Sequence, residues 1–166
     1  MSLVKYRLKR DFSKTTEPKA QNPNSQTKQR FVIQKHNASS LHYDFRLEMK
    51  DDETDEIVLK SWAIPKNIPL SKGIKHLAIQ TEDHPVEYLD FEGEIPAGNY
   101  GAGKVEIWDK GKWGLLKGSF YEKKLSFNLH GEKIKGRFVM IKTKGFGNQK
   151  TASNHWLIWK MEDEFF

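Results

Sequence analysis

The sequence of 166 residues contains no cysteine. Disulfides, cysteine-ligated zinc fingers, iron–sulfur clusters and a thiol nucleophile are therefore excluded, and the composition fits a reducing compartment such as the cytoplasm. There is also no apolar run of about 18 residues, the length that crosses a membrane, and the first residues, MSLVKYRLKRDF, lack the apolar core of a signal peptide. We expect a cytoplasmic protein without membrane contact, in which any metal is bound by histidine, carboxylate or amide groups.

Strongly apolar side chains are missing from residues 13–30, SKTTEPKAQNPNSQTKQR. Such a segment cannot bury enough apolar surface to offset the chain entropy lost on ordering, so by itself it should be mobile. We therefore expect residues 1–30 to form a polar N-terminal segment and residues 31–166 to form one domain. A chain of this length buries about two-thirds of its unfolded surface without a disulfide or a structural metal. A bound metal would then serve function.

Acidic residues are fewer than basic ones, with 22 Asp and Glu against 28 Lys and Arg and a pI near 9.3. This moderate excess favours a polyanionic partner such as nucleic acid, without proving one.

Short segments with alternating apolar and polar residues recur along the chain, and none has the periodicity of a convincing amphipathic helix. The candidate strands are 30–36, 41–49, 56–64, 74–82, 103–109, 124–131, 137–144 and 155–161. Turn signals separate several of them, at Lys110-Gly111, at Gly131-Glu132 and in residues 145–154. The pattern predicts an all-β protein, either a sandwich or, as we expect, a single antiparallel β-barrel of about eight strands.

Chemistry-bearing residues gather in 36-HNASSLHYDFR-46. On a strand over 41–49, alternation directs His42, Asp44 and Arg46 to one face and the apolar residues to the other. A five-residue connection would place His36 opposite His42, whereas a four-residue connection would pair His36 with Leu41. The first register assembles two imidazoles and one carboxylate, a set that suits Mn²⁺, Fe²⁺ or Zn²⁺ better than Ca²⁺ or Mg²⁺. A polar strand face with scattered histidines is more often simply solvated, so this pattern alone leaves both interpretations open.

Several further blocks resemble one known family. They are KRDF and TEP within 9–18, 30-RFVIQKHNASSLHYDFRLE-48, 61-SWAIPK-66, 82-EDHPVEY-88, 91-FEGEIPAGNYGAGKVEIWDKGKW-113 and the terminal HWLIWKMED. Together and in this order, they resemble the 3′-phosphoesterase module of bacterial DNA ligase D over nearly the whole chain.

The resemblance implies a β-barrel that binds Mn²⁺, or another divalent metal such as Co²⁺ or Zn²⁺, through His36, His42 and Asp44. It implies a catalytic set of Arg46, His84, Tyr88, Lys66 and Glu82, and a substrate-binding set of Arg10, Asp11, Glu17, Gln34 and His76. The implied activity removes a 3′-terminal ribonucleoside and then hydrolyses the remaining 3′-phosphate to a 3′-hydroxyl, during double-strand break repair by end joining. The implied substrates are DNA or RNA–DNA 3′ ends of a primer–template.

The implied roles agree with ordinary phosphoryl chemistry. Arg46 and Lys66 would offset charge that develops on phosphoryl oxygens, and His84 would stabilise the transition state or transfer a proton. If residues 84–88 are extended, His84 and Tyr88 share one face. The family resemblance leads us to expect an arginine where this chain has His76, and an imidazole binds phosphate less well than a guanidinium. The N-terminal residues of the set require that segment to fold over the barrel mouth.

Other interpretations of the sequence remain open beside the resemblance. His42 and Asp44 with a distant histidine also fit a jelly-roll Fe²⁺ oxygenase, for which His36 would be dispensable. A non-catalytic nucleic-acid-binding module would need only the basic balance and the aromatic residues. Residues 96–104 are interpreted as a structural turn, because no helical pattern follows them. The chain has no K-x-D-G motif, so we expect a stand-alone, monomeric unit whose ligase or polymerase partner is a separate polypeptide.

Overall fold

The computed structural model describes residues 3–20, 27–144 and 154–162. Its elements, in chain order, are α1 (Val4–Leu8), β1 (Arg30–Asn37), β2 (Leu41–Lys50), β3 (Ile57–Ile64), β4 (Lys75–His84), the 3₁₀ helix η1 (Val86–Asp90), β5 (Gly93–Ile95), β6 (Gly103–Ser119), β7 (Lys124–His130), β8 (Lys135–Lys142) and β9 (His155–Lys160). No helix among these residues is both long and apolar enough to span a membrane.

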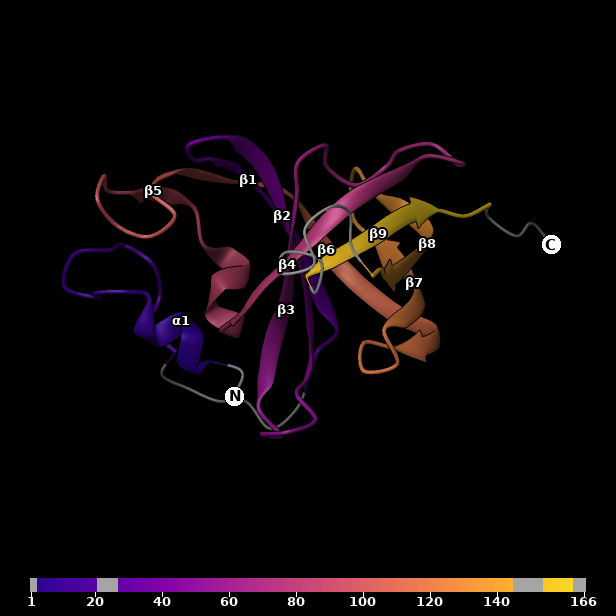
Figure 1. The fold of residues 1–166 in the computed structure, drawn as a ribbon, viewed down its shortest axis with the longest axis horizontal. Coiled ribbons are helices and arrows are strands. Elements are labelled where there is room, and N and C mark those ends of the chain that lie inside the picture. The colour runs from indigo at the N-terminus through magenta and orange to yellow at the C-terminus, as the bar shows by residue number, and fades with distance from the viewer. Residues whose placement is uncertain (1–2, 21–26, 145–153, 163–166) are drawn as a thin grey trace.

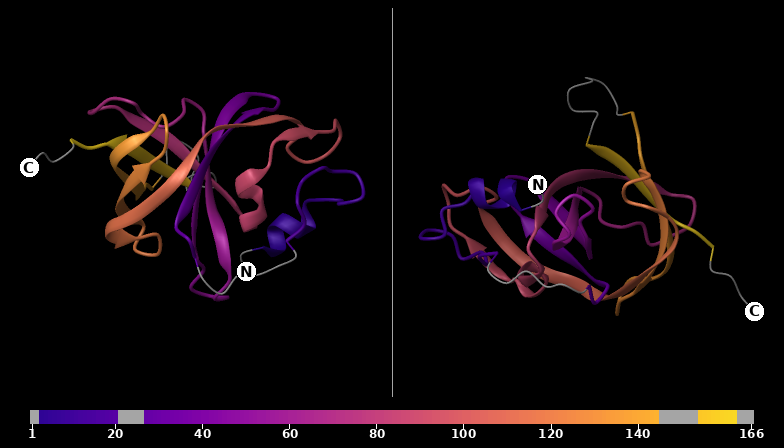
Figure 2. Two further views of the ribbon diagram at one scale, coloured as in Figure 1. Left: turned by 180° about the vertical axis from the view of Figure 1, so that it is seen from behind. Right: turned by 90° about the horizontal axis from the view of Figure 1, so that it is seen from below.

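The strands form one antiparallel sheet that closes on itself. Their order is β1-β2-β3-β4-β9-β8-β7-β6-β5, and an additional pairing of β1 with β6 completes a barrel of eight strands, with the short β5 paired to the first residues of β6. Figures 1 and 2 show α1 and β5 on one side of this barrel and β7, β8 and β9 on the other. The expected all-β barrel of about eight strands is confirmed.

The barrel interior is filled by alternate residues of every strand. Phe45 and Leu47 of β2 are fully buried there against Phe127 of β7, Trp62 of β3 and Trp156 of β9. Because successive strand residues point to opposite faces, the polar residues between them point away from the interior. The predicted apolar face of β2 is confirmed, except that Leu41 at its start is exposed.

A second, smaller apolar cluster lies outside the barrel. Tyr6 of α1 and Tyr88 of η1 pack with Val32 of β1 and Leu59 of β3. The described part of the N-terminal segment, residues 3–20, therefore covers the outer surface of β1 to β4 rather than the barrel mouth, which corrects the expected position. Sequence analysis missed α1 because one buried aromatic residue supplies most of its anchoring. The mobility of residues 1–30 stays a prediction.

One predicted turn is wrong. Lys110 and Gly111 lie inside β6, which continues to Ser119 and pairs first with β1 and then with β7. A Cβ atom built on Gly111 would lie 2.1 Å from the carbonyl oxygen of His130. This glycine therefore permits close backbone approach within a strand, which is the other common use of glycine in sheets. The turn at Gly131-Glu132 between β7 and β8 is confirmed, and residues 145–153 lie outside the described part.

Candidate metal and phosphate site

The β1–β2 hairpin brings the two histidines of the sequence cluster together. His36 pairs directly with His42, and Gln34 pairs with Asp44. The first of the two registers considered above is therefore confirmed. Since Phe45 and Leu47 fill the barrel, His42, Asp44 and Arg46 project from its outer surface, beneath the N-terminal segment.

Each imidazole presents one nitrogen to the same carboxylate. His36 Nδ1 lies 3.2 Å from Asp44 Oδ2, and His42 Nε2 lies 3.2 Å from Asp44 Oδ1. The opposite nitrogens contact backbone carbonyls, with His36 Nε2 2.7 Å from the oxygen of Gly101 and His42 Nδ1 3.2 Å from that of Ser40. A carbonyl only accepts hydrogen bonds, so it fixes the proton on the nitrogen that faces it.

This arrangement fits a divalent cation. With these protons in place, the unprotonated nitrogen of each neutral imidazole faces the ionised carboxylate of Asp44. A nitrogen lone pair and a carboxylate oxygen repel each other, so this arrangement requires a proton or a shared cation between the two groups. One ligand atom from each of His36, His42 and Asp44 lies within 4.8 Å of the others. Metal–ligand bonds of about 2.1 Å place neighbouring ligand atoms roughly 3–3.5 Å apart, close to the 3.2 Å between each imidazole nitrogen and a carboxylate oxygen of Asp44. The contacts with backbone carbonyls are those that orient metal-binding histidines.

The electrostatic surroundings keep the carboxylate charged. Burial alone would raise the pKa of Asp44, but the Arg46 guanidinium and the two imidazoles hold that pKa well below its usual value. The hydrogen bond with Asp44 raises the pKa of His42, against the effect of burial. A proton and a metal therefore compete for this imidazole.

Arg46 is fixed beside this group by three contacts. Its Nε donates to Gln34 Oε1 over 2.7 Å, an Nη atom lies 3.5 Å from Asp44, and its guanidinium stacks 4.7 Å from the centre of the Tyr88 ring. Gln34 is itself held, because its amide donates to the backbone oxygens of Tyr88 and Phe91 over 2.8 and 3.1 Å. Gln34 therefore orients Arg46 and does not itself line the cavity.

The N-terminal segment contributes a second arginine to the site. Arg10 pairs with Glu17 over 2.9 Å and with Glu82 of β4 over 3.1 Å, and its side chain is only 4% exposed. Glu17 also accepts a hydrogen bond of 2.7 Å from the Tyr88 hydroxyl. These buried contacts attach residues 10–17 to β4 and η1. Asp11 assists only indirectly, by accepting hydrogen bonds from the backbone and the hydroxyl of Ser13 in the turn that follows it.

His84 is held in one tautomer and is neutral. Its Nδ1 donates to the backbone oxygen of Glu82 over 2.9 Å, which leaves Nε2 as an acceptor 3.4 Å from Arg10. Burial, and then the positive charges of Arg46 and Arg10, lower the pKa of His84 well below its usual value. The predicted proximity of His84 and Tyr88 is confirmed, with ring centres 4.7 Å apart. However, Tyr88 belongs to η1 and not to an extended segment.

These side chains surround one cavity of about 200 Å³. The predicted residues that line it are Arg10, Glu17, His36, His42, Asp44, Arg46, Glu82, His84 and Tyr88. Sequence analysis missed Tyr100 and Gly101, which also line it and come from the stretch interpreted only as a structural turn. Gly101, with a φ of +73°, places the carbonyl that binds His36. A glycine in the sequence indicates that the backbone can adopt a positive φ at this position. It does not indicate that the carbonyl of Gly101 contacts His36.

Besides Asp11 and Gln34, two further predicted residues do not line this cavity. Lys66 is exposed in the connection between β3 and β4. His76 lies on the same face of β4 as Ala78, which belongs to the barrel interior, and its Nδ1 contacts the backbone oxygen of Asn67 over 2.5 Å. Their implied roles in phosphate binding remain predictions.

A bulge in β4 directs Glu82 and His84 toward the cavity. Leu59 pairs with His84 and Ser61 with Thr81, so Glu82 and Asp83 lie opposite the single residue Lys60. In a regular strand Thr81 and His84 would face opposite sides, yet both line the cavity together with Glu82. Bulges redirect side chains in this way beside active sites.

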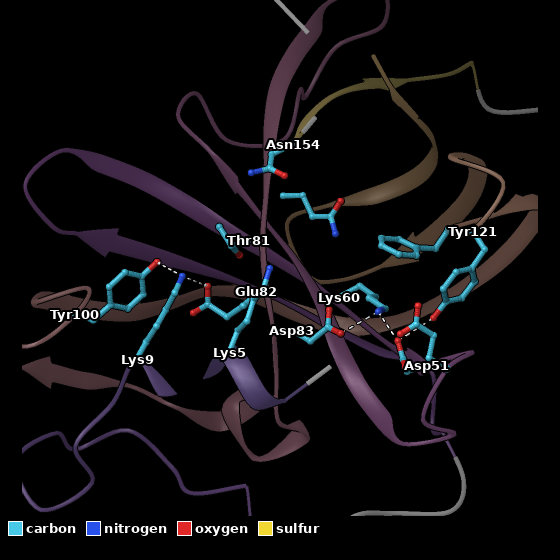
Figure 3. A pocket seen from close by; sticks show the side chains of 13 residues that line it. Lys5, Lys9, Asp51, Lys60, Thr81, Glu82, Asp83, Tyr100, Tyr121 and Asn154 are labelled. Carbon is cyan, nitrogen blue, oxygen red and sulfur yellow. Dashed lines mark hydrogen bonds and ion pairs between the residues drawn. The ribbon is translucent and has the colours of Figure 1, made fainter. Parts of the chain in front are cut away.

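Lys60 of β3, opposite the bulge, forms an ion pair with Asp83 in it. Its side chain is 6% exposed, and its Nζ lies 2.9 Å from Asp83 and 2.8 Å from Asp51 in the β2–β3 turn. Tyr121 donates to Asp51 as well, over 3.1 Å. Figure 3 shows this network at one end of a second pocket, of about 580 Å³, whose other end shares Glu82 and Tyr100 with the site cavity.

Asp83 should make stability depend on pH. Burial raises its pKa from 3.8 to about 6, although Lys60 opposes the shift. Between these values the folded state binds more protons than the unfolded state, so the contribution of Asp83 to stability falls as pH rises. Relative to Asp83→Asn, the wild type should lose up to about 3 kcal/mol of unfolding free energy between pH 4 and pH 7. Urea titrations of both proteins at both pH values measure this loss. A difference in unfolding free energy between the two proteins that is the same at pH 4 and pH 7 would contradict the prediction.

Comparisons with known proteins agree with this geometry. Residues 34–142 match the family described as the DNA Ligase D 3′-phosphoesterase domain. The chain is 46% identical over 171 residues to the "Multifunctional non-homologous end joining protein LigD" of Pseudomonas aeruginosa, covering 97% of this chain and 19% of that protein. It is 49% identical over 148 residues to the protein of the same name in Mycobacterium bovis, covering 86% and 18%, and 42% identical over 172 residues to that of Mycolicibacterium smegmatis, covering 98% and 21%. The chain thus spans about a fifth of the length of these relatives.

Proposed function

Because the chain belongs to the DNA ligase D 3′-phosphoesterase domain family, we propose that it hydrolyses phosphate esters at the 3′ ends of DNA strands during repair by end joining. The observation that carries this proposal is the placement of three imidazoles, three carboxylates and two arginines around one cavity. The family match favours this function over the oxygenase and the binding-module alternatives. The finer proposal is that a 3′-terminal ribonucleoside is removed first and the remaining 3′-phosphate second.

His36, His42 and Asp44 would hold the divalent metal, which we propose to be Mn²⁺, with Co²⁺ or Zn²⁺ as substitutes. A bound metal would act as a Lewis acid on a phosphoryl oxygen. The two nitrogens and one carboxylate oxygen suit these transition metals better than Ca²⁺ or Mg²⁺, which prefer oxygen ligands.

Arg46 and Arg10 would bind the phosphate itself. Guanidinium groups that are already fixed by neighbours bind phosphate oxygens without losing further side-chain entropy. Arg46 is held by Gln34 and Tyr88, and Arg10 by Glu17 and Glu82. Both therefore present preorganised positive charge where negative charge develops during hydrolysis.

His84 would accept a proton rather than donate one at the start of the reaction. Burial and the two arginines lower the pKa of His84, so its Nε2 is unprotonated and can receive a proton as water attacks phosphorus. The bond between phosphorus and the leaving oxygen then breaks, and the leaving oxygen takes up a proton. Tyr88 keeps its hydroxyl proton, since burial raises its pKa, and orients Glu17 and Arg46.

The test is a primer–template labelled at the 5′ end of the primer and carrying one 3′-terminal ribonucleotide. With Mn²⁺, we expect the primer to shorten to a 3′-phosphate and then to convert to a 3′-hydroxyl, and with EDTA we expect no change. A primer that stays intact with Mn²⁺, Co²⁺ and Zn²⁺ would refute the proposed activity. A ligase or polymerase would act on the 3′-hydroxyl product.

A further inference from the structure

The barrel has a second distinctive surface, on the side away from the cavity. In the closed ring of strands, β8 is separated from β2 by the same number of strands in both directions, so the two lie on opposite sides. Figure 1 shows this separation, with α1 and β5 beyond one side of the barrel and β7, β8 and β9 on the other. The catalytic candidates are absent from this far side.

The alternation of side chains along each strand determines which residues of this far side point to the solvent. Leu125, Phe127 and Leu129 of β7 fill the barrel, so Lys124 and the residues that alternate with them point outward. Cross-strand pairing extends the outward row to β6, β8, β9 and β4. On the outward positions of these strands, taken from Lys112 onward in β6 and over Lys75–Ile79, the part of β4 that pairs with β9, no residue is Asp or Glu, and the structure describes all of these positions. The charged residues there are Lys75, Lys112, Lys117, Lys124, Lys135 and Arg137.

Four of these lysines, which we call the far basic face, carry charge that no neighbour offsets. Lys112, Lys117, Lys124 and Lys135 are exposed, and none forms an ion pair within the described residues. Lys112 donates only to the backbone oxygen of Lys28, over 3.2 Å, which leaves its charge uncompensated. The flanking turns contain Glu122 and Glu132, each beside a lysine in sequence, so they add no net charge.

Some exposed lysines elsewhere on the protein are instead paired with carboxylates. Lys14 lies 3.8 Å from Asp11, Lys50 lies 3.7 Å from Asp55, and Lys104 lies 2.8 Å from Glu106. The lysines of the far basic face have no such carboxylate partner within the described residues.

The spacing of the far basic face matches a nucleic-acid backbone. Lys112 and Lys135 both pair with His130, which places them about 10 Å apart across three strands. Lys117 pairs with Ser126 and Lys124 with Ser119, so these lysines are diagonal neighbours, roughly 7–8 Å apart. Duplex DNA carries one negative charge per about 1.7 Å of its axis, so several phosphates span this area.

We propose that the far basic face binds the phosphate backbone of duplex DNA, independently of the cavity and without sequence preference. Flexible lysines on a convex barrel surface reach phosphates and not base edges. The proposal goes beyond the 3′-end chemistry and depends on it only for the choice of DNA as the polyanion. Binding on the far side leaves the cavity accessible to a strand terminus.

The probe is a fluorescent dumbbell duplex, closed by a hairpin loop at each end, which offers no 3′ terminus to the cavity. Binding is measured by anisotropy in EDTA at several salt concentrations. The triple variant Lys117→Gln, Lys124→Gln and Lys135→Gln should bind at least about 10-fold more weakly at low salt. Its slope of log K against log salt should be shallower by about 2.7, close to 0.9 per lost phosphate contact.

The matched control is the triple variant Lys14→Gln, Lys50→Gln and Lys104→Gln, which changes the net charge equally but removes only paired lysines. It should bind the dumbbell nearly as the wild type does. The proposal is overturned if the far-face variant keeps the wild-type affinity and slope, or if the control loses as much. Hydrolysis of a 3′-phosphorylated dinucleotide with Mn²⁺, too short to span both sides, tests the catalytic function separately in all three proteins.

Discussion

Asp44→Asn is expected to reduce 3′-phosphate hydrolysis by about 1,000-fold or more. The replacement keeps the shape of the side chain but removes the charge that the two imidazoles share. Loss of a metal that stabilises transition-state charge costs several kcal/mol, and each 1.4 kcal/mol is a factor of ten in rate. Initial rates on a duplex with a 3′-phosphate terminus measure the effect.

A stability measurement separates this effect from misfolding. Mn²⁺ should raise the thermal midpoint of the wild type, since a ligand that binds only the folded state stabilises it, and should leave that of Asp44→Asn unchanged. Glu106→Gln is the matched control, because Glu106 is a half-buried carboxylate that pairs with Lys104 and lies away from the cavity. Wild-type hydrolysis by a folded Asp44→Asn protein would contradict the assignment.

Lys60→Met is expected to lower the free energy of unfolding by about 3–5 kcal/mol. Lys60 is the partner of both Asp51 and Asp83, so its removal leaves two buried carboxylates near each other without a cation. A buried ion pair contributes little net stability when intact, but removing one partner is costly. Urea unfolding followed by tryptophan fluorescence measures the change.

The same variant should also impair hydrolysis, because Lys60 lies opposite the bulge that directs Glu82 and His84 into the cavity. Adding Asp83→Asn should restore part of the lost stability, since it removes one of the two uncompensated charges. Lys60→Arg, which retains the cation, should lose less stability than Lys60→Met. A Lys60→Met protein as stable and as active as the wild type would show that the network does not hold the bulge.

Alternation along β2 made the metal-ligand candidates predictable. Phe45 and Leu47 identify the interior face, and the opposite face then carries His42 and Asp44. The partner His36 followed from the length of a single hairpin connection, which the register confirms. Local periodicity and one short turn were sufficient here.

Other features depend on contacts between distant parts of the chain. The burial of Glu17 arises from its contacts with Arg10 and Tyr88, although its own segment has no apolar pattern. The bulge opposite Lys60 depends on how β3 and β4 pair. Tyr100 reaches the cavity from a loop that precedes β6. None of these is a periodic signal, so sequence analysis could supply them only through the family resemblance or not at all.

The central claim is that His36, His42 and Asp44 form the metal site on which hydrolysis depends. Its most direct test is a titration of Mn²⁺ into the metal-free protein, with free Mn²⁺ followed by electron paramagnetic resonance. We predict that the wild type binds Mn²⁺ and that both His42→Ala and Asp44→Asn lose this binding while remaining folded. Unchanged binding by both variants, or 3′-phosphate hydrolysis by the wild type that persists in excess EDTA, would contradict the account.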